Sequence, residues 1–402
     1  MRNYISIFLA WLFCLSACKK TQDIHSPQII SISPGQGPVK SFVYITGLYF
    51  DSVATAVTVT FNGVQATIAS INDSAITVIV PNNATTGKIT ITVQGRTTTS
   101  MQDFVILDLP GAWLQKANMI RGNTYIGTAY CCGAGFDIGS YGYVCLGYNG
   151  GGGTNQLFQY DPGSDTWTQM ANAPVSRYLP NWFVINNIAY VGLGVNDQQD
   201  STSKNIYAYD PSTNTWSQKS SFPGIVLNGN ANFAIGNKGY LVGFPSGSSG
   251  PSSAQVWEYD QNADGWTQKN NFPGSYLDPI VAFSIDSLAF LCGWTKDQNQ
   301  TGECWQYYPS TDSWLQKNTF PGTYTYPPVA ITINKHGYVM GGDNWQYDPA
   351  SDTWARMAFF TFFRNGGYGF TIDNRGYFAA GQGDYGFDCF ACSDLWQFTP
   401  PN

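Results

Sequence analysis

The side chains of this 402-residue chain that best suit ligand binding are scattered arginines and tyrosines. A guanidinium group binds a carboxylate through two parallel hydrogen bonds, and a tyrosine ring stacks on the face of a sugar. The candidate ligand-binding residues are Arg121, Arg177, Tyr178, Tyr276, Asp278, Tyr326 and Arg364. If these side chains lie on one surface, they predict a binding site for a carboxylate or a sugar. The alternative is a structural role, in which each arginine holds backbone carbonyls or pairs with a neighbouring acid.

The composition excludes several other kinds of site. The chain has only two histidines, His25 and His336, which argues against a histidine metal cluster or a histidine-dependent triad. A net charge of −7 argues against a nucleic-acid partner, because binding phosphates needs a basic face. The chain is 11% charged and 16% aromatic with 43 glycines, which is typical of β-structure rather than of helical bundles. We expect no cofactor, no metal and no catalytic residue.

The first residues indicate export from the cytoplasm. An apolar stretch from 4 to 15 is too short to span a membrane and fits the core of a signal peptide. It ends in Leu15-Ser16-Ala17-Cys18, which resembles the lipobox of bacterial lipoproteins, where cleavage precedes the cysteine and its thiol is acylated. The alternative is an ordinary secretory signal in which Cys18 is incidental.

This segment sets the expected location of the chain. We predict a signal peptide at residues 1–17 and a lipidated tether at 18–26. No run of 18 apolar residues follows, so lipid is the only membrane contact expected. The predicted location is the cell envelope, as an outer-membrane lipoprotein facing the periplasm or the outside.

Residues 27–107 predict a small immunoglobulin-like β-sandwich. Apolar and polar residues alternate in the runs 57–61, 75–80 and 88–93, which is the pattern of half-buried strands. Turn sequences such as Asn62-Gly63 separate these runs, and about seven strands are expected. The motifs Ile32-Ser33-Pro34, Ile45-Thr46-Gly47, Phe61-Asn62-Gly63, Val80-Pro81 and Thr86-Gly87 resemble the IPT/TIG family. That resemblance implies a spacer or adhesion module without catalytic residues.

Residues 111–402 contain a repeat that predicts a propeller. Segments of the type Tyr-Asp-Pro…Trp, such as the one from Tyr160 to Trp167, recur with their tryptophans 49, 50, 48 and 40 residues apart. A period near 50 built from strands is typical of propeller blades. The third strands of six blades are expected at 157–160, 206–209, 256–259, 304–307, 344–347 and 395–398.

The last repeat lacks an outer strand, and the segment around Trp113 matches that strand in other repeats. We therefore expect the N-terminal strand to complete the sixth blade and close the ring. The repeats resemble the kelch and galactose-oxidase-like superfamily. The diglycine that ends the second kelch strand survives only at Gly341-Gly342, so the subfamily stays open.

Propeller geometry brings the candidate site together. The crossovers between blades and the loops between second and third strands lie on one face, and the sequence makes those segments long and variable. The arginines and tyrosines named above fall in the crossovers, so we expect them near the mouth of the central channel. The resemblance to galactose oxidase does not extend to its copper site, which needs paired histidines. Sialic-acid epimerases share the ring and handle an anionic sugar, which leaves an enzymatic alternative with Asp278 or Glu303 as acid or base.

Nine cysteines point to an oxidising compartment. The candidates for disulfides are Cys131, Cys132, Cys292, Cys304, Cys389 and Cys392. We expect a bond across the ring closure, from Cys131 or Cys132 to Cys389 or Cys392, or one between the last two. Cys292 and Cys304 flank a hairpin and are a further candidate pair. Zinc is the weaker alternative, because an adjacent Cys-Cys pair is poor ligand spacing.

These expectations favour binding over catalysis. The predicted function is that of a lipid-anchored scaffold whose propeller recognises a glycan or an envelope protein. The alternative is an epimerase or mutarotase acting on a sugar acid at an arginine-lined mouth.

Overall fold

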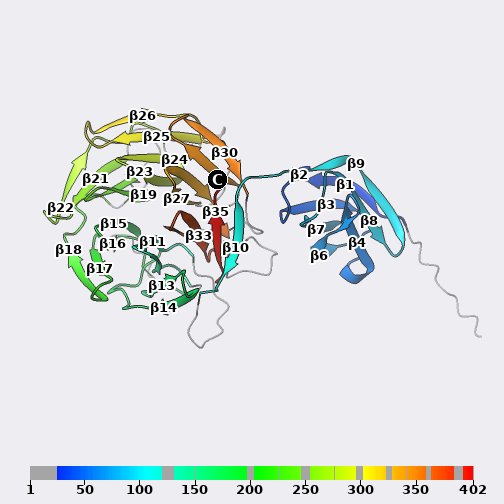
Figure 1. Ribbon diagram of the computed structural model, residues 1–402, viewed down its shortest axis with the longest axis horizontal. Helices are drawn as coiled ribbons and strands as arrows, with labels where there is room; N and C mark the ends of the chain where they lie inside the picture. Colours follow the sequence, from blue (N-terminus) through cyan, green and yellow to red (C-terminus); the bar gives the residue numbers. More distant parts are fainter. Residues whose placement is uncertain are drawn as a thin grey trace, which may run out of the picture.

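The computed structural model describes two all-β domains. The described residues are 25–119, 131–149, 151–196, 203–225, 227–245, 254–275, 277–295, 302–322, 328–341, 343–358, 364–383 and 393–401. Figure 1 shows the strands of the first domain in blue and cyan and those of the second arranged in a ring from cyan to red. In this part of the chain no helix is long and apolar enough to cross a membrane.

The first domain is a sandwich of two sheets. One sheet has the strand order β1-β3-β7-β6 and the other β2-β9-β8-β4-β5. The strands are β1 Gln28–Ser33, β2 Gln36–Gly37, β3 Phe42–Leu48, β4 Val57–Phe61, β5 Val64–Gln65, β6 Thr67–Asn72, β7 Ala75–Ile79, β8 Gly87–Val93 and β9 Arg96–Ile106, with a single 3-10 turn at Ala54–Ala56. The three predicted runs become β4, β7 and β8. Two more strands are present than the seven expected, because β2 and β5 are two-residue pieces.

Alternation along the strands builds the core of the sandwich. Val43, Val59 and Ile91 are fully buried between the two sheets, while their chain neighbours face outward. Asn62 and Gly63 both take positive φ angles, 45° and 86°, so the hairpin from β4 to β5 turns as its Asn-Gly sequence predicts.

The second domain is a six-bladed β-propeller. Each blade is an antiparallel four-stranded sheet, and the first strands β11, β15, β19, β23, β27 and β32 contact one another in a closed circle. Blades one to three are β11–β14 (Ala134–Ile138, Tyr141–Cys145, Leu157–Asp161, Thr166–Gln169), β15–β18 (Asn181–Ile185, Ile188–Gly192, Ile206–Asp210, Thr215–Lys219) and β19–β22 (Leu227–Ile235, Lys238–Pro245, Gln255–Asp260, Gly265–Lys269). Blades four and five are β23–β26 (Leu277–Ile285, Leu288–Thr295, Gly302–Tyr308, Ser313–Gln316) and β27–β30 (Val329–Ile333, His336–Met340, Asn344–Asp348, Thr353–Met357).

The sixth blade combines both ends of the domain. Its strands are β32 Tyr368–Ile372, β33 Arg375–Ala379, β35 Leu395–Thr399 and β10 Ala112–Lys116. Strand β10 pairs with β35 along its whole length, with Trp113 opposite Phe398. The predicted closure by the N-terminal strand is therefore confirmed, and β10 covers the edge that β35 would otherwise expose.

The Tyr-Asp-Pro…Trp repeat joins each blade to the one before it. In the third blade, Asp264 accepts hydrogen bonds from the hydroxyl of Tyr259 (2.6 Å) and from the N–H of Ser220 (3.0 Å). The indole of Trp266 donates to the carbonyl oxygen of Ser220 (3.1 Å). Ser220 directly follows β18, the outer strand of the second blade. Both polar groups of one residue are thus held by the next blade, an arrangement we call the inter-blade latch.

The latch recurs around the ring with changes. Its acceptors are Asp165, Asn214, Asp264, Asp312 and Asp352, and the residues they hold are Ala117, Ala171, Ser220, Asn270 and Asn318. In the fourth blade the indole of Trp314 makes no bond to Asn270, and the side-chain amide of Asn270 donates instead to the carbonyl of Asp312 (2.8 Å). Ala117 follows β10, so the first latch spans the ring closure. At the sixth blade Phe398 replaces the tyrosine, and Ala358 instead bonds to the carbonyl of Pro110 and the indole of Trp113.

Three latch carboxylates, those of Asp165, Asp264 and Asp352, are stabilised in their ionised form. Burial opposes ionisation of Asp264, but hydrogen bonds from Tyr259 and Ser220 and the charge of Lys219 outweigh it, holding its pKa below the ordinary 3.8. Asp165 and Asp352 show the same direction for similar reasons. A lowered folded-state pKa stabilises the fold above the ordinary pKa and is lost as pH falls through the folded value. These three latches therefore strengthen the ring at neutral pH and weaken in acid.

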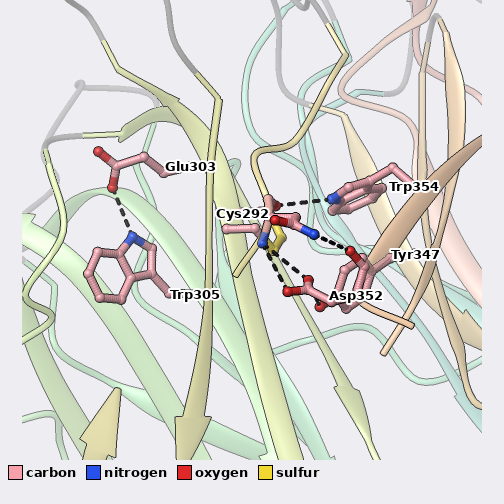
Figure 2. Close-up of a disulfide and its surroundings, with 8 residues drawn as sticks. Cys292, Glu303, Trp305, Tyr347, Asp352 and Trp354 are labelled. Atoms are coloured by element: carbon pink, nitrogen blue, oxygen red, sulfur yellow. Dashed lines mark hydrogen bonds between the residues drawn. A yellow bond between two sulfur atoms is a disulfide. The ribbon is translucent and has the colours of Figure 1, made fainter. Parts of the chain in front are cut away.

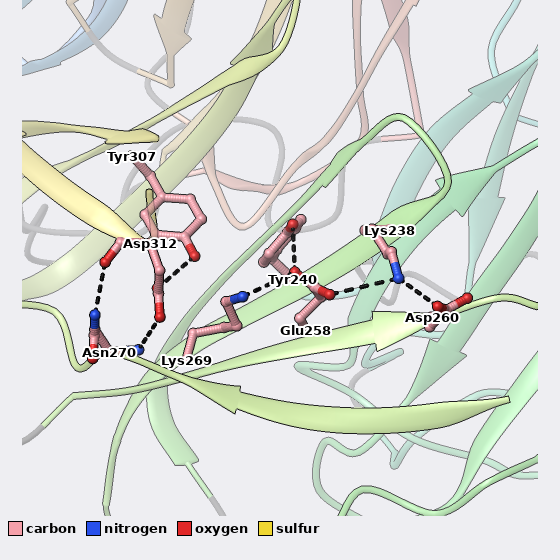
Figure 3. A network of polar contacts seen from close by, with 8 residues as sticks. All are labelled: Lys238, Tyr240, Glu258, Asp260, Lys269, Asn270, Tyr307 and Asp312. Carbon is pink, nitrogen blue, oxygen red and sulfur yellow. Dashed lines mark hydrogen bonds and ion pairs between the residues drawn. The ribbon is translucent and has the colours of Figure 1, made fainter. Parts of the chain in front are cut away.

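One blade carries a charged version of a recurring pair. A tyrosine on the second strand and a glutamine on the third are hydrogen-bonded in three blades, for example Tyr338 with Gln346. In the third blade the acceptor is Glu258, which bonds to the hydroxyl of Tyr240 (2.8 Å). Lys238 and Lys269 lie 3.6 and 3.5 Å from its carboxylate (Figure 3). The two lysines compensate the extra negative charge, so this network has a structural explanation.

Removing one latch acceptor should destabilise the propeller. Asp264 has a φ of 44°, which Asn tolerates and Ala does not, and the second blade already uses Asn214. We expect Asp264→Ala to lower the free energy of unfolding by about 2–4 kcal/mol and Asp264→Asn by about 1 kcal/mol or less. Denaturant titration of both variants checks this. Equal losses in the two would contradict the latch.

Candidate functional site

A cavity of about 330 Å³ lies on the propeller axis. Side chains along each first strand alternate between the blade interior and the central channel, so every second residue faces the axis. The uppermost layer consists of one residue from each blade: Gly135, Trp182, Asn232, Ala282, Ala330 and Gly369, all of which line the cavity. Four of these six are Gly or Ala. The space exists because the side chains at the axis are small.

The rest of the wall places the cavity at one end of the channel. It is formed by segments that lead into first strands or follow second strands: Cys132, Gly133, Leu179, Pro180, Leu193, Gly194, Val195, Ala231, Asp278, Pro279, Ile280, Val281, Pro328, Val329, Gly366 and Gly367. The tight turns between first and second strands, such as Asn186-Asn187, lie at the opposite end of the same strands. The cavity therefore belongs to the face that carries the crossovers.

The polar groups of the described wall are few. Asp278 is the one carboxylate there, and it is half-buried in a bulge of β23, where the pairing with β24 shifts between Leu277 and Ile280. Strand β19 carries the matching bulge in the third blade and contributes the amide of Asn232. Bulges turn side chains out of the regular alternation. The wall thus offers one carboxylate and one amide in a mostly apolar surface with the ring of Trp182.

Only one of the predicted ligand-binding residues lines this cavity among the described residues, namely Asp278. Arg177 and Tyr178 directly precede the wall residue Leu179, and the Tyr178 ring packs edge-on against Tyr148 at 5.5 Å. Arg364 pairs through its backbone with Gly383, and its side chain is not described. Arg121, Tyr276 and Tyr326 lie outside the described residues. The arginine-rich mouth stays a prediction.

Glu303 and His336 have structural positions. The Glu303 carboxylate accepts a hydrogen bond from the indole of Trp305 (2.8 Å; Figure 2). It also accepts one from the N–H of Ser275 (3.3 Å), so it holds the crossover that contains Ser275. His336 begins β28 at the hairpin end of the fifth blade, away from the cavity. Neither residue lines the cavity wall. Glu303 is therefore poorly placed as the acid or base of the enzymatic alternative.

Two of the candidate cysteines are joined by a disulfide. Cys292 on β24 and Cys304 on β25 are direct partners in the strand pairing, and their sulfur atoms are bonded (Figure 2). Both are fully buried in the fourth blade. Cys131 and Cys132 lie beside the cavity as thiols. Cys389 and Cys392 lie outside the described residues, so the bond expected across the ring closure is not tested.

A carboxylate one layer deeper in the channel was missed by the sequence reasoning. Asp137 lies two residues after Gly135 on the channel side of β11, and its side chain is reached by solvent. Burial raises its pKa to about 6, which a hydrogen bond from the N–H of Thr371 (3.1 Å) only partly offsets. The same positions in the other blades of this layer are Val184, Ala234, Ser284, Thr332 and Thr371.

Asp137, Trp182 and Asn232 carry no motif, which explains why they were overlooked. The strand register could have identified them, because each lies at an alternate position of the first strand of its blade. The first and second strands of each blade form a hairpin with a tight turn. Counting every second residue of the first strand back from that turn identifies the residues that face the channel. Aligning the repeats on those turns, rather than on the tryptophans, would have found the cavity wall.

Comparison with known proteins agrees with the two domains. Residues 27–106 match the family model of the IPT/TIG domain. No curated protein matches the chain. The solved structure of YjhT is similar over 69% of this chain and 95% of its own, with a TM-score of 0.54 and 15% identity. Similarity at that identity concerns the fold alone. The class defined here is thus an IPT/TIG domain followed by a six-bladed propeller.

The channel carboxylate should make stability depend on pH in the opposite sense to the latches. Because the pKa of Asp137 is raised to about 6, the folded state holds its proton more tightly, and ionisation above that pH destabilises the fold. We expect Asp137→Asn to raise the melting temperature at neutral pH, with a gain that shrinks as the pH falls through about 6 and vanishes near the ordinary pKa of 3.8. Thermal melts over this pH range, with the exposed Asp373→Asn as control, check it. A pH-independent effect would contradict the assignment.

Proposed function

We propose that this chain is a non-catalytic envelope protein whose propeller binds a sugar residue of a glycan in the axial cavity. An IPT/TIG domain joined to a propeller fold suggests a binding or scaffold role. The observation that carries the finer proposal is the cavity itself, with its volume of about 330 Å³. This lies at the lower end of the range for small-molecule sites, roughly 300–1,000 Å³.

The chemistry of the wall supports a neutral sugar. The ring of Trp182 provides an apolar face for stacking, and the side chains of Asp278 and Asn232 provide an acceptor and an amide for hydroxyl groups. In the described wall Asp278 is the charged side chain, which disfavours an acidic ligand. This modifies the expectation of a carboxylate ligand, which rested on the arginines.

The same wall supports binding over catalysis. Epimerisation requires an acid and a base on opposite sides of the reacting carbon. Among the described wall residues Asp278 is not accompanied by a second carboxylate, a histidine or a lysine. The polar groups present are suited to orienting hydroxyls, and nothing in this set pairs them for proton transfer.

The rest of the chain fits a display arrangement. Residues 18–26 would tether the protein to lipid through Cys18, and the sandwich would act as a spacer between the anchor and the propeller. The envelope location and the kelch type of the repeats belong to this proposal. Support for the kelch type comes from the Tyr-Asp-Pro…Trp repeat with its period near 50 residues.

Filling the cavity should abolish glycan binding. Ala282 faces the axis and is half-buried, so Ala282→Phe places a ring where the ligand would lie. We expect at least about a tenfold loss of affinity for the neutral glycans retained on a glycan array, because the larger side chain excludes the sugar. Ala263→Phe, in the exposed turn between β21 and β22, is the matched control.

Two results would overturn the proposal. Unchanged glycan binding by Ala282→Phe, with an unchanged melting temperature, would move the site away from the cavity. Interconversion of the anomers or epimers of N-acetylneuraminate, followed by NMR, would establish the enzymatic alternative instead.

The lipid anchor has a separate test. Cys18→Ser removes the thiol that would be acylated, so the variant should incorporate no labelled fatty acid, whereas the parent does. Cys14→Ser is the matched control and should be labelled like the parent. Equal labelling of the Cys18 variant and the parent would contradict lipidation at this residue.

A further inference from the structure

We propose that Cys131 and Cys132, which are adjacent in the chain, form a disulfide with each other and thereby make the cavity wall a site of reversible oxidation. The two sulfur atoms lie 2.7 Å apart. Carbon atoms in van der Waals contact lie roughly 3.5–4.0 Å apart, and sulfur is larger than carbon. The two sulfur atoms therefore lie closer together than ordinary packing allows, at a separation between van der Waals contact and a covalent bond.

The backbone around the pair is fixed from three blades. The N–H and carbonyl of Cys131 both bond to Tyr148 of the first blade. The N–H of Cys132 donates to the carbonyl of Gly366, before the sixth blade, and its own carbonyl accepts from Leu179, before the second blade. These last two hydrogen bonds are short, 2.7 and 2.6 Å. Holding two reacting groups in place in this way raises their effective concentration.

The backbone conformation of Cys132 and the glycine at 366 make room for the Cys132 sulfur. Cys132 has a φ of 64°, in the left-handed region that few side chains adopt. Gly366 lies against its sulfur, where an added Cβ would come within 2.8 Å. A larger residue at 366 would push the sulfur away, so this glycine has a packing reason to be there. The strained backbone persists because the surrounding bonds impose it.

The two thiols differ in access, which sets the order of reaction. Cys132 lines the cavity and is half-buried, whereas Cys131 is 3% exposed. A hydrogen bond from the Cys132 thiol lowers the pKa of Cys131. An oxidant entering by the cavity would therefore meet Cys132 first, and Cys131 is placed to attack the product.

The oxidation step balances with a disulfide-carrying oxidant, such as a thiol–disulfide oxidoreductase or oxidised glutathione. The hydrogen bond to Cys131 and burial raise the pKa of Cys132, so Cys131 loses its proton first and then takes the proton of Cys132. The Cys132 sulfur thereby attacks one sulfur of the oxidant, which releases one thiol and leaves a mixed disulfide, and Cys131 loses its proton again. The Cys131 thiolate then attacks the Cys132 sulfur and releases the second thiol. The pair loses two protons and two electrons in total, and the oxidant gains them.

The product would be more easily reduced than an ordinary structural disulfide. Adjacent Cα atoms are about 3.8 Å apart, less than the roughly 4.4–6.8 Å usual for disulfides, and such strain favours reduction. Its sulfur is also reached from the cavity, whereas Cys292 and Cys304 are fully buried. We therefore expect the wall disulfide to open first in a mild dithiol. The inference does not depend on which ligand the cavity binds.

Peptide mapping of the full chain tests the proposal. Protein purified without reductant is denatured, treated with iodoacetamide and digested, and the peptide that contains Cys131 and Cys132 is weighed. We expect it to carry no alkyl group and to be two hydrogens lighter than the dithiol. After brief native treatment with dithiothreitol it should carry two alkyl groups, while the Cys292–Cys304 pair stays closed.

Variants exclude the competing pairings. In Cys132→Ser, Cys131 loses its partner and should be alkylated without reduction, whereas Cys145→Ser, a matched buried control, should leave the wall peptide closed. Double alkylation of the parent before reduction would overturn the proposal. A cross-linked peptide joining either residue to Cys389, Cys392 or Cys145 would overturn it as well.

Discussion

The propeller depends on the latch, in which each blade grips one residue of the blade before it. Asp264 accepts from the N–H of Ser220 while Trp266 donates to its carbonyl, so the same residue is fixed at both polar groups. Backbone groups at the end of an outer strand would otherwise need water or a neighbour. Because the grip acts between blades, it also fixes their spacing and angle around the axis.

The axial cavity follows from that spacing. With the outer strands joined by latches and the aromatic repeat filling the space between blades, the first strands stand at a set distance from the axis. What remains open there is decided by side-chain size. Gly135, Ala282, Ala330 and Gly369 leave space in the uppermost layer, whereas Trp182 supplies a single large face. The same circle brings Cys132 against Gly366, although 234 residues separate them in the chain. Closing the ring thus brings polar and reactive side chains from distant segments of the chain to one cavity wall.

The repeat made the fold predictable from sequence, but the site was harder to predict. Tyrosine and tryptophan recur because latches and blade packing demand those types, so the third strands could be located to within a residue or two. Strand β10 was predicted to close the ring because Trp113 repeats the same signature. The positions that face the channel require no particular residue type. Small residues such as Gly and Ala occur in many structural settings, so their presence does not predict a cavity. Of the predicted residues Asp278 lines the described wall and Arg177 does not, while Trp182 lines it without having been predicted. Bulges and strand register decide which side chains face the axis.

The central claim is that the axial cavity is the binding site, and a crystal structure of the protein with a bound glycan tests it most directly. Our account predicts a sugar ring against Trp182, with hydroxyl groups within hydrogen-bond distance of Asp278 and Asn232. Glycan density on the outer strands, on the hairpin face or on the sandwich, with the axial cavity holding only water, would contradict it.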